Sequence, residues 1–85
     1  MEEEETILRD ALRLVSAAGT SGVLKSKLLL AVRKLDGTFL DPEQQTVVWG
    51  ILTGREWIAG HLEPVWHNTR WCLTPKGAEA LERLS

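Results

Sequence analysis

The sequence predicts a single α+β domain in which three helices are followed by a two-stranded hairpin and a terminal helix. Apolar residues recur with the 3.6-residue period of helices as far as Arg55, and from Trp57 they alternate with polar residues, as they do in strands. The pair Thr74-Pro75 then ends the alternation, and such a pair is typical of a helix start. These three observations set the expected order of elements.

Length and composition limit the class of protein. The 85 residues suffice for one domain, residues 1–85, with ordinary shares of hydrophobic (44%) and charged (26%) residues. Cys72 is the single cysteine, so an internal disulfide is excluded and a reducing compartment is favoured. The acidic start "MEEEETILRD" does not resemble a signal peptide, and no apolar run approaches the roughly 20 residues of a membrane span. We therefore expect a cytoplasmic protein that does not enter a membrane.

The charge balance bears on nucleic-acid binding. The formal net charge is −2, and four of the twelve acidic residues occupy positions 2–5. Positions 6–85 therefore hold eight acidic and ten basic residues. A strong nucleic-acid binder carries a larger basic excess, so the charge of this chain argues against tight DNA binding.

Residues 3–18 predict the first helix. The apolar residues of this segment fall on one stripe at helical spacing, and Gly19 is a natural C-terminal stop. The glutamates of the first turn lie at the positive end of the helix dipole, where negative charge is favourable. The stripe consists of Ile7, Leu8, Ala11, Leu12, Val15 and Ala18.

A second helix is expected from Ser26, which can cap it, to about Leu35. Residues 22–24 are too few for a helix and form an extended stretch before it. The pair Asp36-Gly37 is a turn signal that ends the helix. The buried side of this helix is expected to comprise Leu28, Leu29, Val32 and Leu35. Two apolar residues of the connection that follows are expected to hold it against the core, Phe39 and Leu40.

The third helix has the clearest local signal in the chain. Asp41 is a capping residue, Pro42 suits the first helical position, and Gln44 stands where a capping box needs its second partner. We expect the helix to end near Gly54. The glycines at Gly50 and Gly54 each cost roughly 1 kcal/mol relative to alanine, which suggests that something approaches that side of the helix closely.

The alternating region predicts two antiparallel strands joined by a wing-like connection, residues 64–69, that is too long for a tight turn. The residues expected to face the core are Ile58, Leu62, Trp71 and Leu73. A register that places them together sets Glu63 opposite Arg70 and His61 opposite Cys72 on the outer face.

The terminal helix is expected to begin at Pro75, with Thr74 as its cap. Gly77 would allow the first turn to pack closely against the sheet. The apolar edge that returns to the core is expected to consist of Ala78, Leu81 and Leu84.

Two stretches carry a resemblance to a known family. "LTGREWI" (52–58) is similar to the passage from the third helix into the first wing strand of the winged helix-turn-helix superfamily. "RWCLTPKGAEAL" (70–81) resembles the aromatic-x-Leu-Thr-Pro-Lys-Gly close that is frequent in that superfamily. With the order of elements, the resemblance covers essentially the whole chain and implies a three-helix bundle, a two-stranded β-hairpin wing and a C-terminal helix.

Three features depart from the family pattern. The link between the second and third helices, residues 36–40, is longer than the compact turn of roughly three or four residues. Glu56 stands where these proteins often have glycine. The outward side of the third helix carries neither Lys nor Arg, and it comprises Glu43, Thr46, Val47, Gly50 and Thr53.

The resemblance implies a transcriptional regulator that places the helix starting at Pro42 in the major groove of double-stranded DNA and the wing on the backbone. It implies base contacts from Gln44, Gln45 and Thr46, since glutamine can bond adenine twice and threonine can contact a thymine methyl. It implies phosphate contacts from Lys25, Lys27 and Arg55, and wing contacts from His67, Asn68, Thr69 and Arg70. A homodimer through the first and last helices would place two modules on two half-sites.

A protein-interaction or assembly module of the same fold, without DNA binding, is the alternative. A neutral third helix that carries Val47 and two glycines would suit a packed interface. Trp66 is either folded back over the sheet, which we expect, or exposed as an anchor for a protein partner, because tryptophan is enriched at interface hot spots.

Chemical activity has little support in the sequence. His61, His67 and Cys72 are too few and too irregularly spaced for structural zinc, which normally takes four ligands. The stretch "GTSG" (19–22) lacks the lysine and the spacing of a phosphate-binding loop, and no serine or cysteine has recognisable catalytic partners. We expect no metal, no cofactor and no enzymatic activity.

Overall fold

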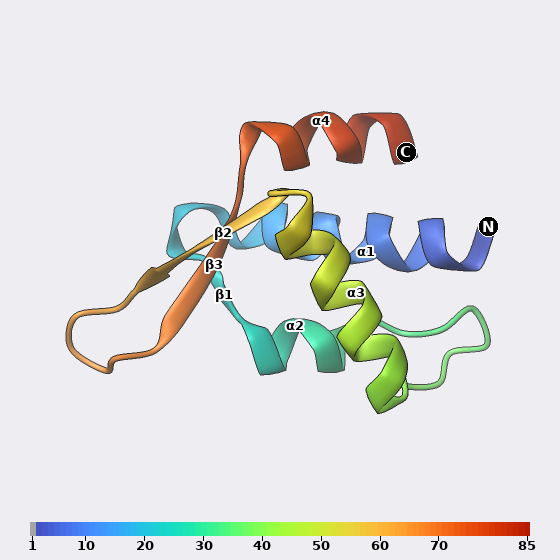
Figure 1. The fold of residues 1–85 in the computed structure, drawn as a ribbon, viewed down its shortest axis with the longest axis horizontal. Helices are drawn as coiled ribbons and strands as arrows, with labels where there is room; N and C mark the ends of the chain where they lie inside the picture. Colours follow the sequence, from blue (N-terminus) through green and yellow to red (C-terminus); the bar gives the residue numbers. More distant parts are fainter. Residues whose placement is uncertain (1) are drawn as a thin grey trace.

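The computed structural model describes residues 2–85, which form an α+β fold of four α-helices and one three-stranded antiparallel sheet (Figure 1). The expected α+β class is therefore confirmed. The helices are α1 (Glu2–Ala18), α2 (Lys25–Ala31), α3 (Pro42–Gly54) and α4 (Pro75–Leu84). The strands are β1 (Val23–Leu24), β2 (Ile58–Leu62) and β3 (Thr69–Leu73), in the order β1-β3-β2. A 3-10 turn, Gly19–Ser21, joins α1 to β1.

α1 lies at the centre of the packing, with α4 along one side and α2 and α3 on the other (Figure 1). The apolar stripe predicted for α1 is buried except at Ala18, which is half-buried, and Ala11, Leu12 and Val15 have no exposed surface. Removing these side chains from water is the main favourable contribution to folding. The residues that complete the buried core around α1 are Leu28, Val32, Leu40, Val48, Leu52, Trp57, Ile58 and Ala80.

The predicted capping box of α3 is confirmed. The backbone N–H of Gln44 donates to Asp41 Oδ1 at 2.9 Å, and the backbone N–H of Asp41 donates to the side-chain Oε1 of Gln44 at 3.2 Å. These bonds satisfy amides that a helix start otherwise leaves unpaired. Trp49, which is half-buried, meets Trp71 of β3 edge-to-face with ring centroids 4.7 Å apart, and this contact ties α3 to the sheet.

α2 is shorter than the sequence predicts. It starts at Lys25 and has Leu24 at the capping position with no side-chain cap bond, so the expectation that Ser26 caps the helix is wrong. It ends at Ala31 because Val32 is extended, with ψ 134°. The helical spacing of Val32 and Leu35 misled the prediction, since Val32 is buried from an extended backbone and Leu35 is exposed.

Residues 33–39 fold into a tight turn instead of the last helical turn; we call them the 33–39 turn. Arg33 and Phe39 form an isolated β-bridge, and the Lys34 amide donates to the Thr38 carbonyl at 2.8 Å. Asp36 Oδ1 accepts from the amide and the hydroxyl of Thr38 at 3.0 and 2.6 Å, and these bonds lower the pKa of Asp36. Phe39 is exposed, so its predicted role of holding the connection against the core is wrong, whereas the burial of Leu40 is confirmed.

The sheet contains a strand that the sequence analysis did not identify as one. β1 pairs with β3, with Val23 opposite Trp71, so the predicted two-stranded hairpin is the larger part of a three-stranded sheet. A two-residue strand has too little periodicity to be recognised. Gly22, with φ 75°, makes the turn into this strand, where a Cβ atom would lie 2.9 Å from Arg70 Cβ.

The predicted register of β2 and β3 is wrong by two residues. His61 lies opposite Arg70, and Cys72 lies opposite Ala59. A shift of two residues keeps the side chains on the same faces of the sheet, and the expected neighbours become diagonal ones. The expectation that Leu62 faces the core is wrong, because this side chain is 60% exposed at the end of β2. Glu63 Oε2 accordingly lies 3.4 Å from Arg70 Nε.

α4 begins as predicted. Thr74 Oγ1 accepts from the Gly77 amide at 3.0 Å, and Pro75 is the first helical residue. A Cβ atom at Gly77 would lie 2.0 Å from the Trp57 carbonyl oxygen, so the predicted close packing there is confirmed. The prediction that Ala78 faces the core is wrong, because Ala78 is exposed and Ala80 is buried.

Candidate functional site

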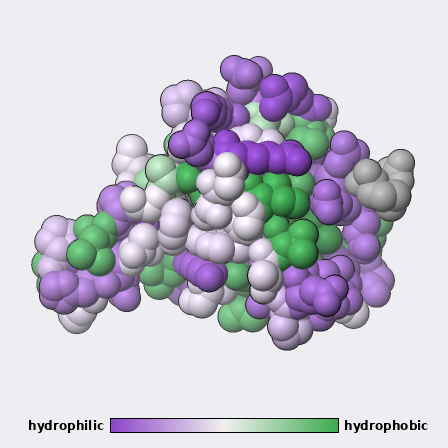
Figure 2. All heavy atoms as spheres, in the orientation of Figure 1, coloured by the Kyte–Doolittle hydropathy of each residue, from purple (hydrophilic) through white to green (hydrophobic). Residues whose placement is uncertain are grey.

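The outward face of α3 carries almost no charge. Thr46, Val47 and Gly50 are exposed on it, and Glu43 is the one charged side chain among its described residues. The Thr46 hydroxyl donates to the Pro42 carbonyl at 3.0 Å, one turn back. Figure 2 shows pale residues, neither strongly hydrophilic nor hydrophobic, over the C-terminal half of α3. The predicted lack of Lys and Arg on this face is confirmed by the geometry.

Nothing in the described chain approaches the glycines of α3. A Cβ atom placed on Gly50 or Gly54 would have no neighbour within 4 Å. The close approach expected from these glycines is therefore not made inside residues 2–85. The face is free to receive another molecule there.

One side of this face, towards α2, gathers several of the predicted DNA-contacting residues; we call it the α2 flank. A shallow hollow of about 330 Å³ is lined by Lys25, Leu29, Gln45, Thr46, Trp49 and Gly50. The Lys25 ammonium lies 5.0 Å from the centroid of the Trp49 ring, within the range of a cation–π contact. Lys25, Gln45 and Thr46 are among the DNA-contacting residues predicted from the sequence, whereas Trp49 is not.

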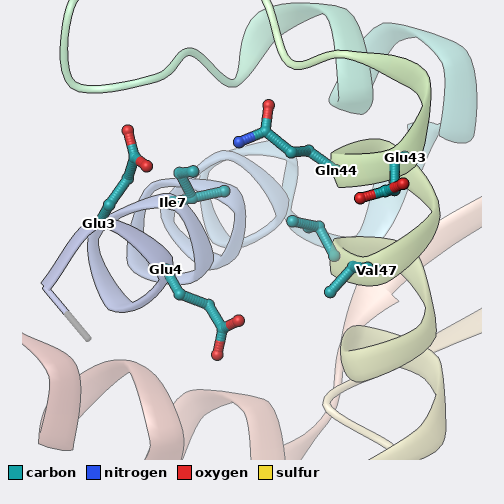
Figure 3. Close-up of a pocket in the computed structure, with 7 residues that line it drawn as sticks. Glu3, Glu4, Ile7, Glu43, Gln44 and Val47 are labelled. Atoms are coloured by element: carbon teal, nitrogen blue, oxygen red, sulfur yellow. The ribbon is translucent and has the colours of Figure 1, made fainter.

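The other side of the face, towards the N-terminus of α1, is acidic; we call it the α1 flank. Its hollow of about 250 Å³ is lined by Glu3, Glu4, Ile7, Glu43, Gln44, Val47 and Val48. In Figure 3 the labelled side chains of α1 and α3 surround the space between the two helices. Three carboxylates and the apolar atoms of Ile7, Val47 and Val48 therefore line the same hollow. Gln44 also lies on this flank, with its Oε1 already bound in the capping box.

The predicted phosphate-contacting cations differ in their partners. Among the side chains of residues 3–85, no carboxylate lies within 4 Å of Lys25, Lys27 or Arg55, whereas Arg70 pairs with Glu63. The Arg55 guanidinium lies 5.1 Å from the Trp57 ring centroid, next to the end of α3. Arg70 is therefore the least available of the predicted cations, because binding DNA would cost it an existing ion pair.

The wing projects from one end of the molecule (Figure 1), and its loop exposes two large apolar side chains. Its loop is closed by the Glu63 amide, which donates to the Asn68 carbonyl at 2.7 Å, and His67 has φ 60°. Trp66 is 72% exposed and Val65 is 73% exposed. The expectation that Trp66 folds back over the sheet is wrong.

The remaining wing residues of the predicted DNA site are accessible. His67, Asn68 and Thr69 are all exposed, and Thr69 is the first residue of β3 instead of part of the loop. Hydrophobic and hydrophilic side chains are mixed at this end of the molecule in Figure 2. The wing therefore lacks the concentrated positive charge that would by itself favour a phosphate backbone.

Cys72 and His61 are neighbours, as the sequence suggested. Cys72 Sγ lies 3.9 Å from His61 Nδ1 and 3.7 Å from the Thr20 carbonyl oxygen. Among the described residues no three His, Cys, Asp or Glu side chains converge as metal ligands do. The pair by itself is below the ligand number of a structural metal site.

Comparisons with protein-family models, curated proteins and solved structures found no match to this chain. No helix within residues 2–85 has both the length and the apolar character needed to cross a bilayer.

Proposed function

We propose that this chain is a winged-helix domain that binds double-stranded DNA as a cytoplasmic transcriptional regulator, with α3 in the major groove. The observation that supports this most is the α2 flank, where Lys25 lies beside Gln45 and Thr46. A cation next to amide and hydroxyl groups on an exposed helix is the combination that contacts phosphates and base edges together.

Three α3 residues of the α2 flank have roles in this proposal, and they are Gln45, Thr46 and Gly50. Gln45 reads a base edge, and its Nε2 is held only by a long 3.4 Å bond to the Leu40 carbonyl, which a base can replace. The Thr46 methyl contacts a thymine methyl. Gly50 leaves room for the backbone of α3 to approach the duplex. Gln44 is the weaker base reader, since its side-chain oxygen is used by the capping box.

The phosphate contacts come from Lys25, Lys27 and Arg55, which are all exposed. Three such contacts give a slope of about −3 in a plot of log affinity against log salt concentration. An isolated module with this few contacts binds weakly, with Kd values in the range of about 10⁻⁴ to 10⁻⁶ M for non-specific DNA. A dimer on two half-sites would bind more tightly.

The test is a fluorescence polarisation titration with a labelled duplex of random sequence, at salt concentrations between about 50 and 200 mM. Replacing Lys25 and Lys27 by glutamine should weaken binding and reduce the salt slope by about 2. The matched control is Arg83→Gln, which removes one cation from α4, far along the chain from the α2 flank. Absence of binding at tens of micromolar protein at the lowest salt would overturn the proposal.

A protein-interaction module is the second candidate, and the exposed wing tip favours it. Val65 and Trp66 present a large apolar area on a loop that projects into solvent, and exposed tryptophan is a frequent interface anchor. Val47 is 48% exposed on α3 and is the other anchor of this candidate. If the polarisation titration fails while Trp66→Ser improves solubility without changing the thermal midpoint, this candidate gains over DNA binding.

A further inference from the structure

The α1 flank has a composition that DNA would not select. Glu3 and Glu4 from α1 and Glu43 from α3 border the hollow, and Ile7 and Val47 supply apolar atoms to it (Figure 3). Its lining includes no Lys or Arg among the described residues. At about 250 Å³, the hollow is smaller than the roughly 300–1,000 Å³ of most small-molecule sites. It is suited to a protruding side chain with an adjacent positive charge.

The 33–39 turn has the complementary composition. Its guanidinium, at Arg33, lies 4.0 Å from the ring centroid of Phe39 and has no carboxylate within 4 Å in the described part of the chain. Leu35, at the turn itself, is 63% exposed. The turn thus presents two large apolar side chains next to a cation that has no carboxylate partner among the described side chains.

The shape of the 33–39 turn is fixed before any contact is made. Arg33 Nη1 donates to the Gly37 carbonyl at 3.1 Å, and Asp36 holds Thr38 through two hydrogen bonds. Gly37 adopts φ 87°, which favours glycine. A preorganised turn loses little conformational entropy when it docks.

Both surfaces lie at the same end of the molecule. The N-terminus of α1 and the connection that contains the 33–39 turn stand together at one end of the longest axis (Figure 1). A two-fold axis near this end would bring the turn of each copy to the α1 flank of the other. Such an arrangement is closed and makes the contact twice, whereas a single head-to-tail contact would extend into a filament.

We propose that two copies of this chain form a symmetric dimer in which the 33–39 turn of each copy docks into the α1 flank of the other. Leu35 or Phe39 enters the hollow beside Val47, and Arg33 approaches the carboxylates of Glu4 and Glu43. The contact is electrostatic as well as apolar, so the dimer weakens as salt is raised. The proposal does not rest on DNA binding: Lys25, Gln45 and Thr46 line the other flank of α3, whereas Gln44 and Val47 lie on the docked side.

Sedimentation velocity of the full chain, from low micromolar to hundreds of micromolar, measures the dimer. We expect a reversible dimer at the upper concentrations, and a Kd at least about tenfold higher in Arg33→Glu and in Val47→Asp. Combining Arg33→Glu with Glu43→Lys should lower the Kd again relative to Arg33→Glu alone, because the exchanged charges attract across the interface. Circular dichroism confirms that each variant is folded.

The matched control is Trp66→Ser, which changes the wing tip and should leave the Kd unchanged. A chain that stays monomeric at hundreds of micromolar, or a dimer that Trp66→Ser dissociates and Arg33→Glu does not, overturns the proposal. So does a double variant that associates no better than Arg33→Glu. Loss of DNA binding in the polarisation assay with an intact dimer would overturn the proposed function and leave this inference standing.

Discussion

Two regions of the molecule contain glycines in opposite environments, one closely packed and one facing open space. At the α4 seam, which we define as Glu56, Trp57, Thr74 and Gly77, a Cβ atom on Gly77 would lie 2.0 Å from the Trp57 carbonyl oxygen. On the outward face of α3, a Cβ atom on Gly50 would have no neighbour within 4 Å. At the seam, the chain's own atoms fill the space next to the glycine, whereas on the α3 face this space is empty.

The difference separates residues that the fold needs from residues that it leaves free. At the seam the Trp57 carbonyl accepts from the Thr74 amide at 3.0 Å, and the Thr74 hydroxyl donates to the Glu56 carbonyl at 2.6 Å. Every one of these groups is satisfied within the chain. The α3 glycine costs helix stability, and no packing among the described residues offsets that cost.

Gly77→Ala should change the stability most, because it disrupts the close packing of the α4 seam. The new methyl group cannot be placed without moving α4 away from the Trp57 carbonyl, which is backbone and cannot rotate aside. We expect a loss of about 3 kcal/mol or more, out of a total of about 5–15 kcal/mol for natural domains. Urea unfolding followed by tryptophan fluorescence measures it. A change below about 1 kcal/mol would show that the seam is looser than this geometry.

The elements whose signals are local could be predicted from the sequence. Asp41, Pro42 and Gln44 set the start of α3 through bonds within four residues, and Thr74 with Pro75 sets the start of α4 in the same way. Such signals need no knowledge of the rest of the chain. The α+β order followed from them and from the change of hydrophobic period.

The elements that depend on distant contacts could not be predicted. Leu35 continues the helical spacing of α2, but Val32 reaches the core from an extended backbone and the chain turns back at Gly37. The register of β2 and β3 depends on wing-loop geometry, and the position of Trp66 depends on whether the sheet offers it a surface. The α2 flank was predicted in part, since Lys25 and Gln45 were named from the resemblance while their proximity to Trp49 required the fold.

Gly50→Ala tests the solvent-exposed face of α3, and we expect it to raise the free energy of unfolding, whereas Gly77→Ala lowers it. The methyl group meets empty space and improves helix propensity, so we expect a gain of up to about 1 kcal/mol and a rise in Tm of about 4–8 °C. If a duplex lies against this face, the same variant should bind DNA more weakly although it is more stable. Thermal unfolding and the polarisation titration, run on the same sample, separate the two effects. Higher stability with unchanged affinity would place any DNA contact elsewhere.

Glu56→Gly tests the seam at a residue that departs from the winged-helix pattern that the sequence resembles, and we expect the smallest effect. Glu56 has φ 58°, a left-handed conformation that glycine adopts without strain, so the variant should raise Tm by less than Gly50→Ala does. The opposing loss is the exposed ion pair in which Lys76 Nζ lies 2.8 Å from Glu56 Oε1. This pair lowers the pKa of Glu56 below its ordinary value of 4.5, so its contribution is present above that pH and is lost as the pH falls through the lowered pKa. The gain in Tm on going to glycine should therefore be larger in acid than at neutral pH.

The control is Glu56→Gln, which keeps the backbone strain and removes the charge, so we expect no gain in Tm at any pH. A rise in Tm equal to that of the glycine variant would mean that the glycine substitution does not act by relieving backbone strain.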